Sequence, residues 1–289
     1  MSDKVKLFFK NYIEDATLTA SSQAITKENL KKYKLSKVWR TTDLTSEYIS
    51  ADLTQAVGIN FIALWGHNLT TAATIRVRIG NDATFVTNLY DTTSYAWEAV
   101  TGFDEGGFDE GGFDGVPILS DYNGYPYYTI IRLSTSYNAR YIRLDITDAA
   151  NPDGYFQAGY LACGYMFETE YDISIPSELP SWVDPSIQFE TESSDLWVCK
   201  KPKYRVANYS FEFLSKAEAL ITFDDLSRIV GGSRPIILLY FSDDITYQYR
   251  YAMYGLITNA SQGLIKRQLR QNTEVNSYGI TISVRELRQ

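Results

Sequence analysis

Carboxylate pairs are plentiful in this sequence, but the histidines and cysteines that could serve nucleophilic or metal-ion catalysis are few. The one histidine is His67, in the stretch LWGHNL, and the two cysteines are Cys163 and Cys199. A nucleophile paired with His67 would need a Ser or Cys brought near it by the fold, and no G-x-S-x-G turn accompanies it. The three positions match no zinc-ligand spacing. We therefore predict no catalytic residue, no transition metal and no cofactor, and a structural role for His67. Free thiols are favoured over the alternative, a single bridge between Cys163 and Cys199.

The repeated stretch GFDEGGFDEGGFDG, at 102–115, contains side chains of the kind that bind calcium. Calcium binds hard oxygen ligands, and the repeat sets carboxylates among glycines, although not at the spacing of an EF-hand loop. The carboxylates are Asp104, Glu105, Asp109, Glu110 and Asp114. The alternative is a loop lengthened by local duplication, since the entropy cost of closing a loop grows slowly with its length. We favour the extended loop over the calcium site.

Two stretches are candidate subunit interfaces. The repeat places a phenylalanine at every fifth residue, which a purely solvated linker would not do, and we hypothesise that these rings pack against a neighbouring subunit. They are Phe103, Phe108 and Phe113. The basic stretch LIKRQLRQN could meet an acidic partner surface, or it could be a solvated loop. Its cations are Lys266, Arg267 and Arg270.

Aromatic rings can also stack on the faces of sugars. The candidates for such a glycan site are Trp65, Trp97 and Tyr125. Core and interface positions are the commoner use of Trp and Tyr. Both interpretations stay open at this point.

The elements that must position these residues are mostly short strands. In TIRVRI, at 74–79, polar and apolar residues alternate strictly, as a half-exposed antiparallel strand requires. Strands rich in β-branched and aromatic residues are predicted at 47–53, 59–66, 73–80, 83–90, 127–134 and 140–148. Strands at such close spacing predict a β-sandwich.

A second β-rich part is predicted to begin near Met166. There YDISIPSELPSWVDPS favours a linker or an edge strand, because residues before proline avoid the helical conformation. One helix is predicted near 216–230, with Ser215 and Glu218 as a capping box and Gly231 as a left-handed cap. Further strands are predicted at 209–214, 235–241, 246–258 and 277–287. We predict two domains: 1–168, with a long insert at 91–126, and 169–289.

The composition argues against two classes of partner. The chain has 289 residues, a formal net charge of −8 and a pI of about 4.8. Binding nucleic-acid phosphates needs a concentrated basic surface, so we expect no nucleic acid. No run of about 18 apolar residues is present, so we expect no membrane insertion. The 23 Tyr and 14 Phe against 3 Met favour strands, and we expect a mainly β protein.

Two stretches together carry a resemblance to a known family. They are SKVWRTTDLTSEYISADLTQAVGINFIALWGHNLTTAATIRVRIG and ARYIRLDITDAANPDGYFQAGYLACG. In the order of their W-R-T segment, strands and N-P-D-G turn, they resemble the discoidin-like (galactose-binding-like) jelly-roll domains in tail proteins of tailed bacteriophages. This resemblance covers roughly 12–168. The later part is similar to the sandwich-plus-helix modules with which such tail proteins form rings.

The resemblance implies a structural virion protein of the phage tail tip, hub or baseplate, similar to a distal tail protein. Its implied partners are further copies of itself in a homo-oligomeric ring, other phage tail proteins, and a host-surface glycan where the jelly roll faces outward. Our leading prediction is this non-enzymatic virion component, synthesised in the host cytoplasm. The alternative is a carbohydrate-binding module that recognises host-surface glycans, and a glycan-active enzyme is a third candidate.

Overall fold

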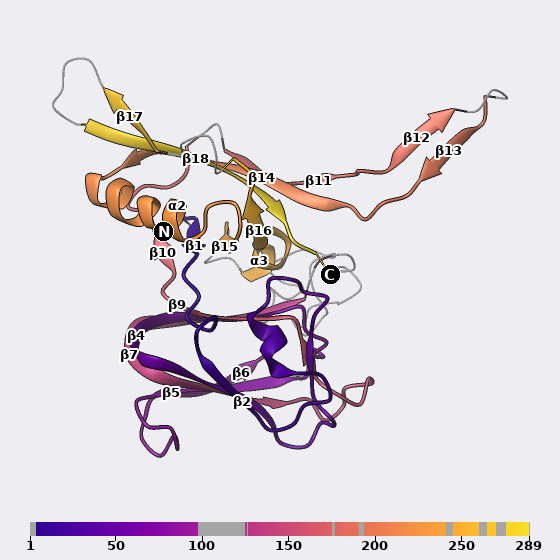
Figure 1. Cartoon of the computed structure of the whole chain (residues 1–289), viewed down its shortest axis with the longest axis vertical. Helices are drawn as coiled ribbons and strands as arrows, with labels where there is room; N and C mark the ends of the chain where they lie inside the picture. The colour runs from indigo at the N-terminus through magenta and orange to yellow at the C-terminus, as the bar shows by residue number, and fades with distance from the viewer. Residues whose placement is uncertain are drawn as a thin grey trace, which may run out of the picture. The chain divides into compact units, whose positions relative to one another are not determined.

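The computed structural model describes residues 4–97, 125, 127–174, 177–190, 194–240, 245–259, 265–269 and 276–288. Antiparallel strands dominate these residues (Figure 1), which confirms the mainly β prediction. The chain divides into two compact units. Unit 1 comprises residues 1–9, 168–240 and 251–287, and unit 2 comprises residues 10–167, 241–250 and 288–289.

Unit 2 is built on a six-stranded antiparallel sheet. Its strands follow the order β2-β4-β7-β5-β6, and β9 also pairs with β4. A second, two-stranded sheet joins β3 and β8. The elements are β2 (Thr17–Ala20), η1 (Lys27–Lys31), β3 (Trp39–Arg40), β4 (Glu47–Trp65), β5 (Thr74–Gly80), β6 (Asn88–Tyr95), β7 (Tyr128–Thr147), β8 (Gln157–Ala158) and β9 (Tyr160–Gly164).

Strand β5 confirms the alternation expected from TIRVRI. Ile75, Val77 and Ile79 are buried, and burial of such a side chain contributes roughly 1.5–3 kcal/mol. Arg76 and Arg78 lie on the opposite face, where both form ion pairs. This alternation gives the large sheet one apolar face and one polar face.

Strands β4 and β7 correct the predicted strand boundaries. The sequence predicted two strands in each of these regions, whereas the structure has one long strand in each. Their pairing shifts register between Asp52 and Val57, where residues 53–56 of β4 stand opposite residue 140 alone. The extra residues form a bulge, with Thr54 at φ 68°. A bulge interrupts the alternation of side chains without ending the strand, and the sequence pattern therefore looked like two strands.

The strand predicted at 83–90 is also wrong in its placement. The side chain of Asp82 accepts hydrogen bonds from the backbone N–H groups of Thr84 and Val86, and Phe85 has a φ of 57°. These contacts make a turn, because an Asp side chain can replace a backbone acceptor two residues on. Strand β6 begins only at Asn88.

Unit 1 has its own antiparallel sheet. The strand order is β10-β1-β15-β16-β18-β14-β11, and β17 pairs with β18. A separate two-stranded sheet joins β12 and β13. The strands are β1 (Lys6–Phe8), β10 (Phe167–Glu168), β11 (Glu178–Val183), β12 (Ile187–Glu190), β13 (Leu196–Cys199), β14 (Tyr204–Leu214), β15 (Pro235–Leu239), β16 (Met253–Ile257), β17 (Ile265–Leu269) and β18 (Asn276–Glu286).

The predicted helix near 216–230 has a π-helical first part, η3 (Glu218–Phe223), followed by α2 (Asp224–Ile229). Its capping box is present: Glu218 N–H donates to Ser215 Oγ at 3.2 Å, and Ser215 N–H donates to Glu218 Oε2 at 2.8 Å. A further helix, α3 (Ile245–Tyr251), replaces the first half of the strand predicted at 246–258. None of the helices in the described ranges is long and apolar enough to cross a membrane.

Candidate functional site

Most of the predicted interface residues lie outside the described residues. This holds for the repeat with Phe103, Phe108 and Phe113, for its five carboxylates, Asp104, Glu105, Asp109, Glu110 and Asp114, and for Arg270. Lys266 and Arg267 belong to β17, where they stand opposite Gly279 and Tyr278 of β18. Among the described residues, no group of three or more His, Cys, Asp or Glu is placed to hold a metal ion.

The predicted glycan candidates occupy interior positions. Trp65 is fully buried and stacks on Tyr128, with 4.2 Å between ring centroids. Trp97 is buried too, and its Nε1 donates to the carbonyl of Leu69 at 3.1 Å. Tyr125 is half-buried. Because a sugar must reach the face of a ring to stack on it, the two tryptophans are part of the core of unit 2.

The hairpin of β12 and β13 carries an apolar surface that the sequence analysis missed. The two strands pair with Ile187 opposite Cys199 and Phe189 opposite Trp197. Residues directly opposite in an antiparallel pair, and residues two apart in one strand, point to the same face. These four side chains therefore form one apolar surface, which we call the hairpin face.

The hairpin face is open to solvent. Ile187, Phe189 and Trp197 are 51%, 53% and 61% exposed, and Cys199 is a free, exposed thiol. An isolated two-stranded hairpin is at best marginally stable in water. A surface of this kind marks an interaction site, because monomeric proteins rarely expose contiguous apolar patches. A partial sequence signal was present: apolar residues alternate with a polar one in IQF, and LWVC is a short apolar run, on either side of the polar run ETESSD.

The strands that lead into the hairpin are fixed in unit 1 by a buried ion pair. Strand β11 precedes β12 and β14 follows β13 along the chain (Figure 1). Arg205 of β14 donates through Nε to Glu286 Oε1 of β18 at 2.9 Å, and through a terminal nitrogen to the carbonyl of Ala252 at 3.0 Å. Both charged side chains are almost fully buried. Removing one partner of such a pair costs about 3–5 kcal/mol, because the other charge is left buried and uncompensated.

Unit 1 exposes a second group of large apolar side chains on other elements. Leu220 and Ile221 project from η3, and Phe213 lies near the end of β14. The ring of Phe213 meets that of Tyr171, which is also exposed. We call these four residues the helix patch.

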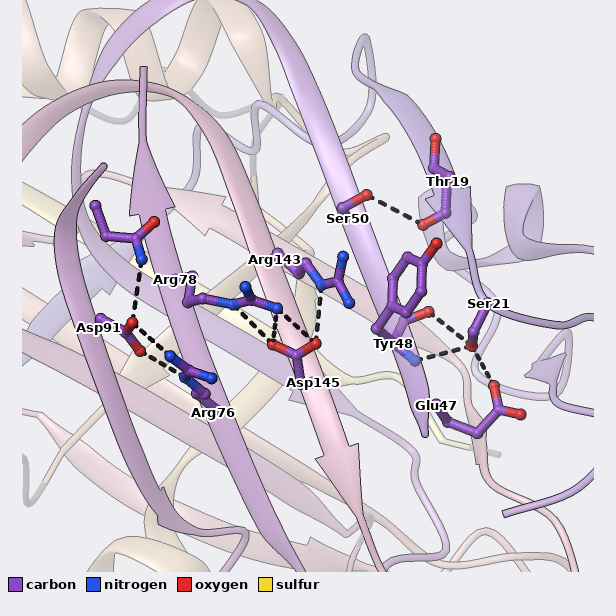
Figure 2. A network of polar contacts seen from close by, with 11 residues as sticks. Thr19, Ser21, Glu47, Tyr48, Ser50, Arg76, Arg78, Asp91, Arg143 and Asp145 are labelled. Carbon is purple, nitrogen blue, oxygen red and sulfur yellow. Dashed lines mark hydrogen bonds and ion pairs between the residues drawn. The ribbon is translucent and has the colours of Figure 1, made fainter. Parts of the chain in front are cut away.

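The outer face of the large sheet in unit 2 is polar and charged (Figure 2). We call it the polar sheet face, and it comprises Tyr48, Ser50, Arg76, Arg78, Asp91, Arg143 and Asp145. Arg76 holds Asp91 with two hydrogen bonds of 2.7 Å. Arg78 holds Asp145 through Nε at 2.9 Å and through a terminal nitrogen, and Arg143 Nε donates to the same carboxylate at 2.8 Å. The guanidinium of Arg143 lies 3.7 Å from the ring centroid of Tyr48.

These ion pairs shape the electrostatics of the face. Hydrogen bonds from Arg76 lower the pKa of Asp91 below its usual value. Asp52, farther along β4, is held by Arg140 in the same way, at 2.7 and 2.8 Å, and its pKa is lowered as well. Asp91 and Asp52 therefore stay ionised at neutral pH. Bidentate pairs of this kind hold planar groups in fixed directions.

Comparisons with known proteins give structural neighbours and no sequence relatives. No protein-family model and no curated protein sequence matches the chain, whereas 82 chains of solved structures do. One is chitosan-binding module 1 of a chitosanase/glucanase from Paenibacillus sp. IK-5, with 16% identity, a TM-score of 0.36, and coverage of 54% of this chain and 99% of that one.

Two further neighbours are a lectin domain and another carbohydrate-binding module. The lectin domain of lectinolysin, complexed with Lewis B antigen, has 12% identity and a TM-score of 0.37, over 53% of this chain and 95% of that one. The family 32 module of C. perfringens NanJ, in complex with galactose, has 14% identity and a TM-score of 0.36, over 56% of this chain and 99% of that one. Each likeness concerns about half of this chain.

Proposed function

We propose that this chain is a non-catalytic structural subunit that joins other protein subunits through the hairpin face. The observation that carries the proposal is the register of β12 and β13, which puts Ile187, Phe189, Trp197 and Cys199 on one exposed side. Aromatic side chains of this size dominate the binding energy of protein interfaces. Covering them with a partner removes apolar surface from water and stabilises a hairpin that is marginal alone.

The partner we propose is a second copy of the same chain. Unit 1 offers the hairpin face and, on other elements, the helix patch. A contact between two different surfaces is heterologous, and repeated contacts of this type close into a ring when the rotation allows it.

A ring of this kind would suit the phage tail-tip, hub or baseplate component that the sequence resembles. In that assignment the remaining partners are other tail proteins and the place of action is the virion. What supports it is the combination of the sequence resemblance with an interface surface on unit 1. Imaging purified virions with an antibody against the chain tests it, and labelling at the tail tip is the expected result.

The assembly itself is tested with two pairs of substitutions. Phe189→Ser with Trp197→Ser should weaken self-association at least 100-fold, because each aromatic at the centre of an interface contributes about 2 kcal/mol or more. Val86→Ser with Tyr95→Ser is the matched control, since these exposed side chains belong to unit 2. The measurement is light scattering coupled to size-exclusion chromatography. A monomeric wild type at high concentration, or equal assembly of both variants, would contradict the proposal.

A second candidate function, carbohydrate binding by unit 2, is favoured by the polar sheet face. This face presents hydroxyl, guanidinium and carboxylate groups on an open surface (Figure 2). Planar side chains with several donors and acceptors suit the hydroxyl-rich surface of a sugar. A glycan array probed with the full chain should give binding to a restricted set of glycans. The same binding should persist in the Phe189→Ser, Trp197→Ser variant, and a chain that binds no glycan at millimolar concentrations would rule this function out.

A further inference from the structure

The polar sheet face contains an unbalanced arrangement of charge. Arg78 of β5 and Arg143 of β7 stand directly opposite each other, and like charges in that position destabilise a sheet. They share one carboxylate, Asp145. The neighbouring Arg76 is matched by Asp91. One positive charge therefore remains on this face, in a chain whose formal net charge is −8.

The surplus charge lies at Arg143, whose guanidinium is held in one orientation. Its Nε donates to Asp145, and its plane packs against the ring of Tyr48. In Figure 2 the dashed line from Arg143 to Asp145 starts at Nε and none starts at its two terminal nitrogens. Within the described ranges, no hydrogen bond from these two nitrogens is formed. The side chain thus presents a pre-oriented pair of donors to solvent.

Hydroxyl groups line the sheet beside this guanidinium. Ser50 of β4 stands opposite Arg143, and Thr19 of β2 stands opposite Ser50. Both residues lie on the outer face of the sheet, as the alternation of burial along β2 and β4 shows. Arg143 and these hydroxyls form one row across three strands. A planar carboxylate fits the paired donors of a guanidinium, and hydroxyl groups can bond to the rest of a sugar.

We propose that Arg143 binds the carboxylate of an acidic sugar, a hexuronate unit, with Ser50 and Thr19 beside the sugar ring. This inference rests on the second candidate function and names its ligand class and its anchoring residue. The opposed arginines are then explained by the ligand, because a bound carboxylate supplies the negative charge that the bare sheet lacks. Asp145 orients Arg143 for this contact.

The test is isothermal titration calorimetry of the full chain with trigalacturonate at neutral pH and low salt. The fully methyl-esterified trimer is the uncharged probe, and acetate and inorganic sulfate are the free anions. The acid should bind at least 10-fold more tightly than its ester and than either free anion. Arg143→Gln should weaken binding of the acid about 10- to 100-fold, the loss expected for hydrogen bonds to a charged group. Arg143→Lys should give an intermediate loss, because it keeps the charge but not the paired donors.

Arg140→Gln is the matched control. Arg140 lies on β7 as well and is paired with Asp52, so this substitution removes the same charge from the same strand. It should change the affinity by less than about 3-fold, since screening by water weakens a distant exposed charge. Arg143→Gln should remain folded, because it removes one of two opposed cations and leaves the Arg78 pair with Asp145 in place. A melting temperature close to that of the wild type checks this.

The remaining outcomes separate this inference from the function on which it rests. Equal binding of acid and ester, or unchanged binding in Arg143→Gln, would overturn the inference and leave carbohydrate binding standing. Acetate or sulfate binding as tightly as the trimer would show an anion site without sugar recognition. Failure of both trimers to bind at millimolar concentration would overturn the inference, and glycan binding would then rest on the array alone.

Discussion

His67 is of a residue type that often takes part in catalysis, but in this fold it has a structural role. Its Nδ1 accepts the N–H of Leu69 at 3.2 Å, and its Nε2 lies 3.1 Å from Thr129 Oγ1. The edge of the imidazole meets the ring of Trp97, with 5.7 Å between centroids. Both nitrogens are therefore satisfied in the neutral ring. The structural, hydrogen-bonded role predicted from the sequence agrees with this geometry.

Burial lowers the pKa of His67 to about 4, from the ordinary value of 6.5. The unfolded chain therefore takes up a proton at a higher pH than the folded chain does. The contribution to the free energy of unfolding is complete above pH 6.5 and is lost as the pH falls toward 4, by at most about 3 kcal/mol. Urea denaturation at several pH values measures it.

His67→Gln is the control for this pH dependence, because it removes the titrating group while other acidic groups still titrate. The difference in unfolding free energy between wild type and variant should shrink by about 3 kcal/mol between pH 7 and pH 4. A difference that does not change over this range would show that folding leaves the pKa of the imidazole unshifted.

The predictable elements are those whose pattern depends on nearby residues. The capping box of η3 and the alternation of β5 involve residues within a few positions, and both were predicted. The bulge in β4 and the helix α3 were missed. In α3 the aromatic residues of TYQYRY favour a strand by local preference, and the burial of Gln248 and Tyr249 shows that tertiary packing decides instead.

The polar sheet face and the hairpin face depend on which residues of neighbouring strands stand opposite each other. The sequence alone does not give this strand register, so the two faces were only partly predictable. The outward direction of Arg76 and Arg78 follows from the alternation in TIRVRI. Their carboxylate partners, Asp91 and Asp145, do not follow, because they belong to β6 and β7 and meet β5 only in the folded sheet. The hairpin face needed the pairing of Phe189 with Trp197, which the residues of either strand alone do not specify.

The start of η3 gives a test at the level of one element. Ser215→Ala removes the hydroxyl that accepts Glu218 N–H and should lower the free energy of unfolding by about 1 kcal/mol. Ser227→Ala, in α2, is the matched control, since its hydroxyl bonds back to the carbonyl of Phe223 within the helix and such a bond adds little stability. The two variants are compared by urea denaturation. Equal losses would mean that the capping box does not stabilise this segment.

The whole molecule combines two units with different surfaces. Unit 1 exposes apolar side chains on the hairpin face and the helix patch, and unit 2 exposes a charged sheet face. Apolar surface that becomes buried favours lasting association between proteins, whereas exposed guanidinium and carboxylate groups favour recognition of a polar ligand. The two proposals thus assign assembly to unit 1 and ligand binding to unit 2, and each can fail without the other.

Covering of the hairpin face can be followed through the native thiol of Cys199. The chain has two cysteines; Cys163 is fully buried and Cys199 is exposed on the hairpin face. A maleimide therefore reports mainly on Cys199. Its labelling rate is measured over a range of protein concentrations that spans self-association, with the Phe189→Ser, Trp197→Ser variant as the control. We predict that labelling of the wild type slows as assembly forms while the variant reacts at one rate throughout. A labelling rate that stays constant while the wild type assembles would contradict the account.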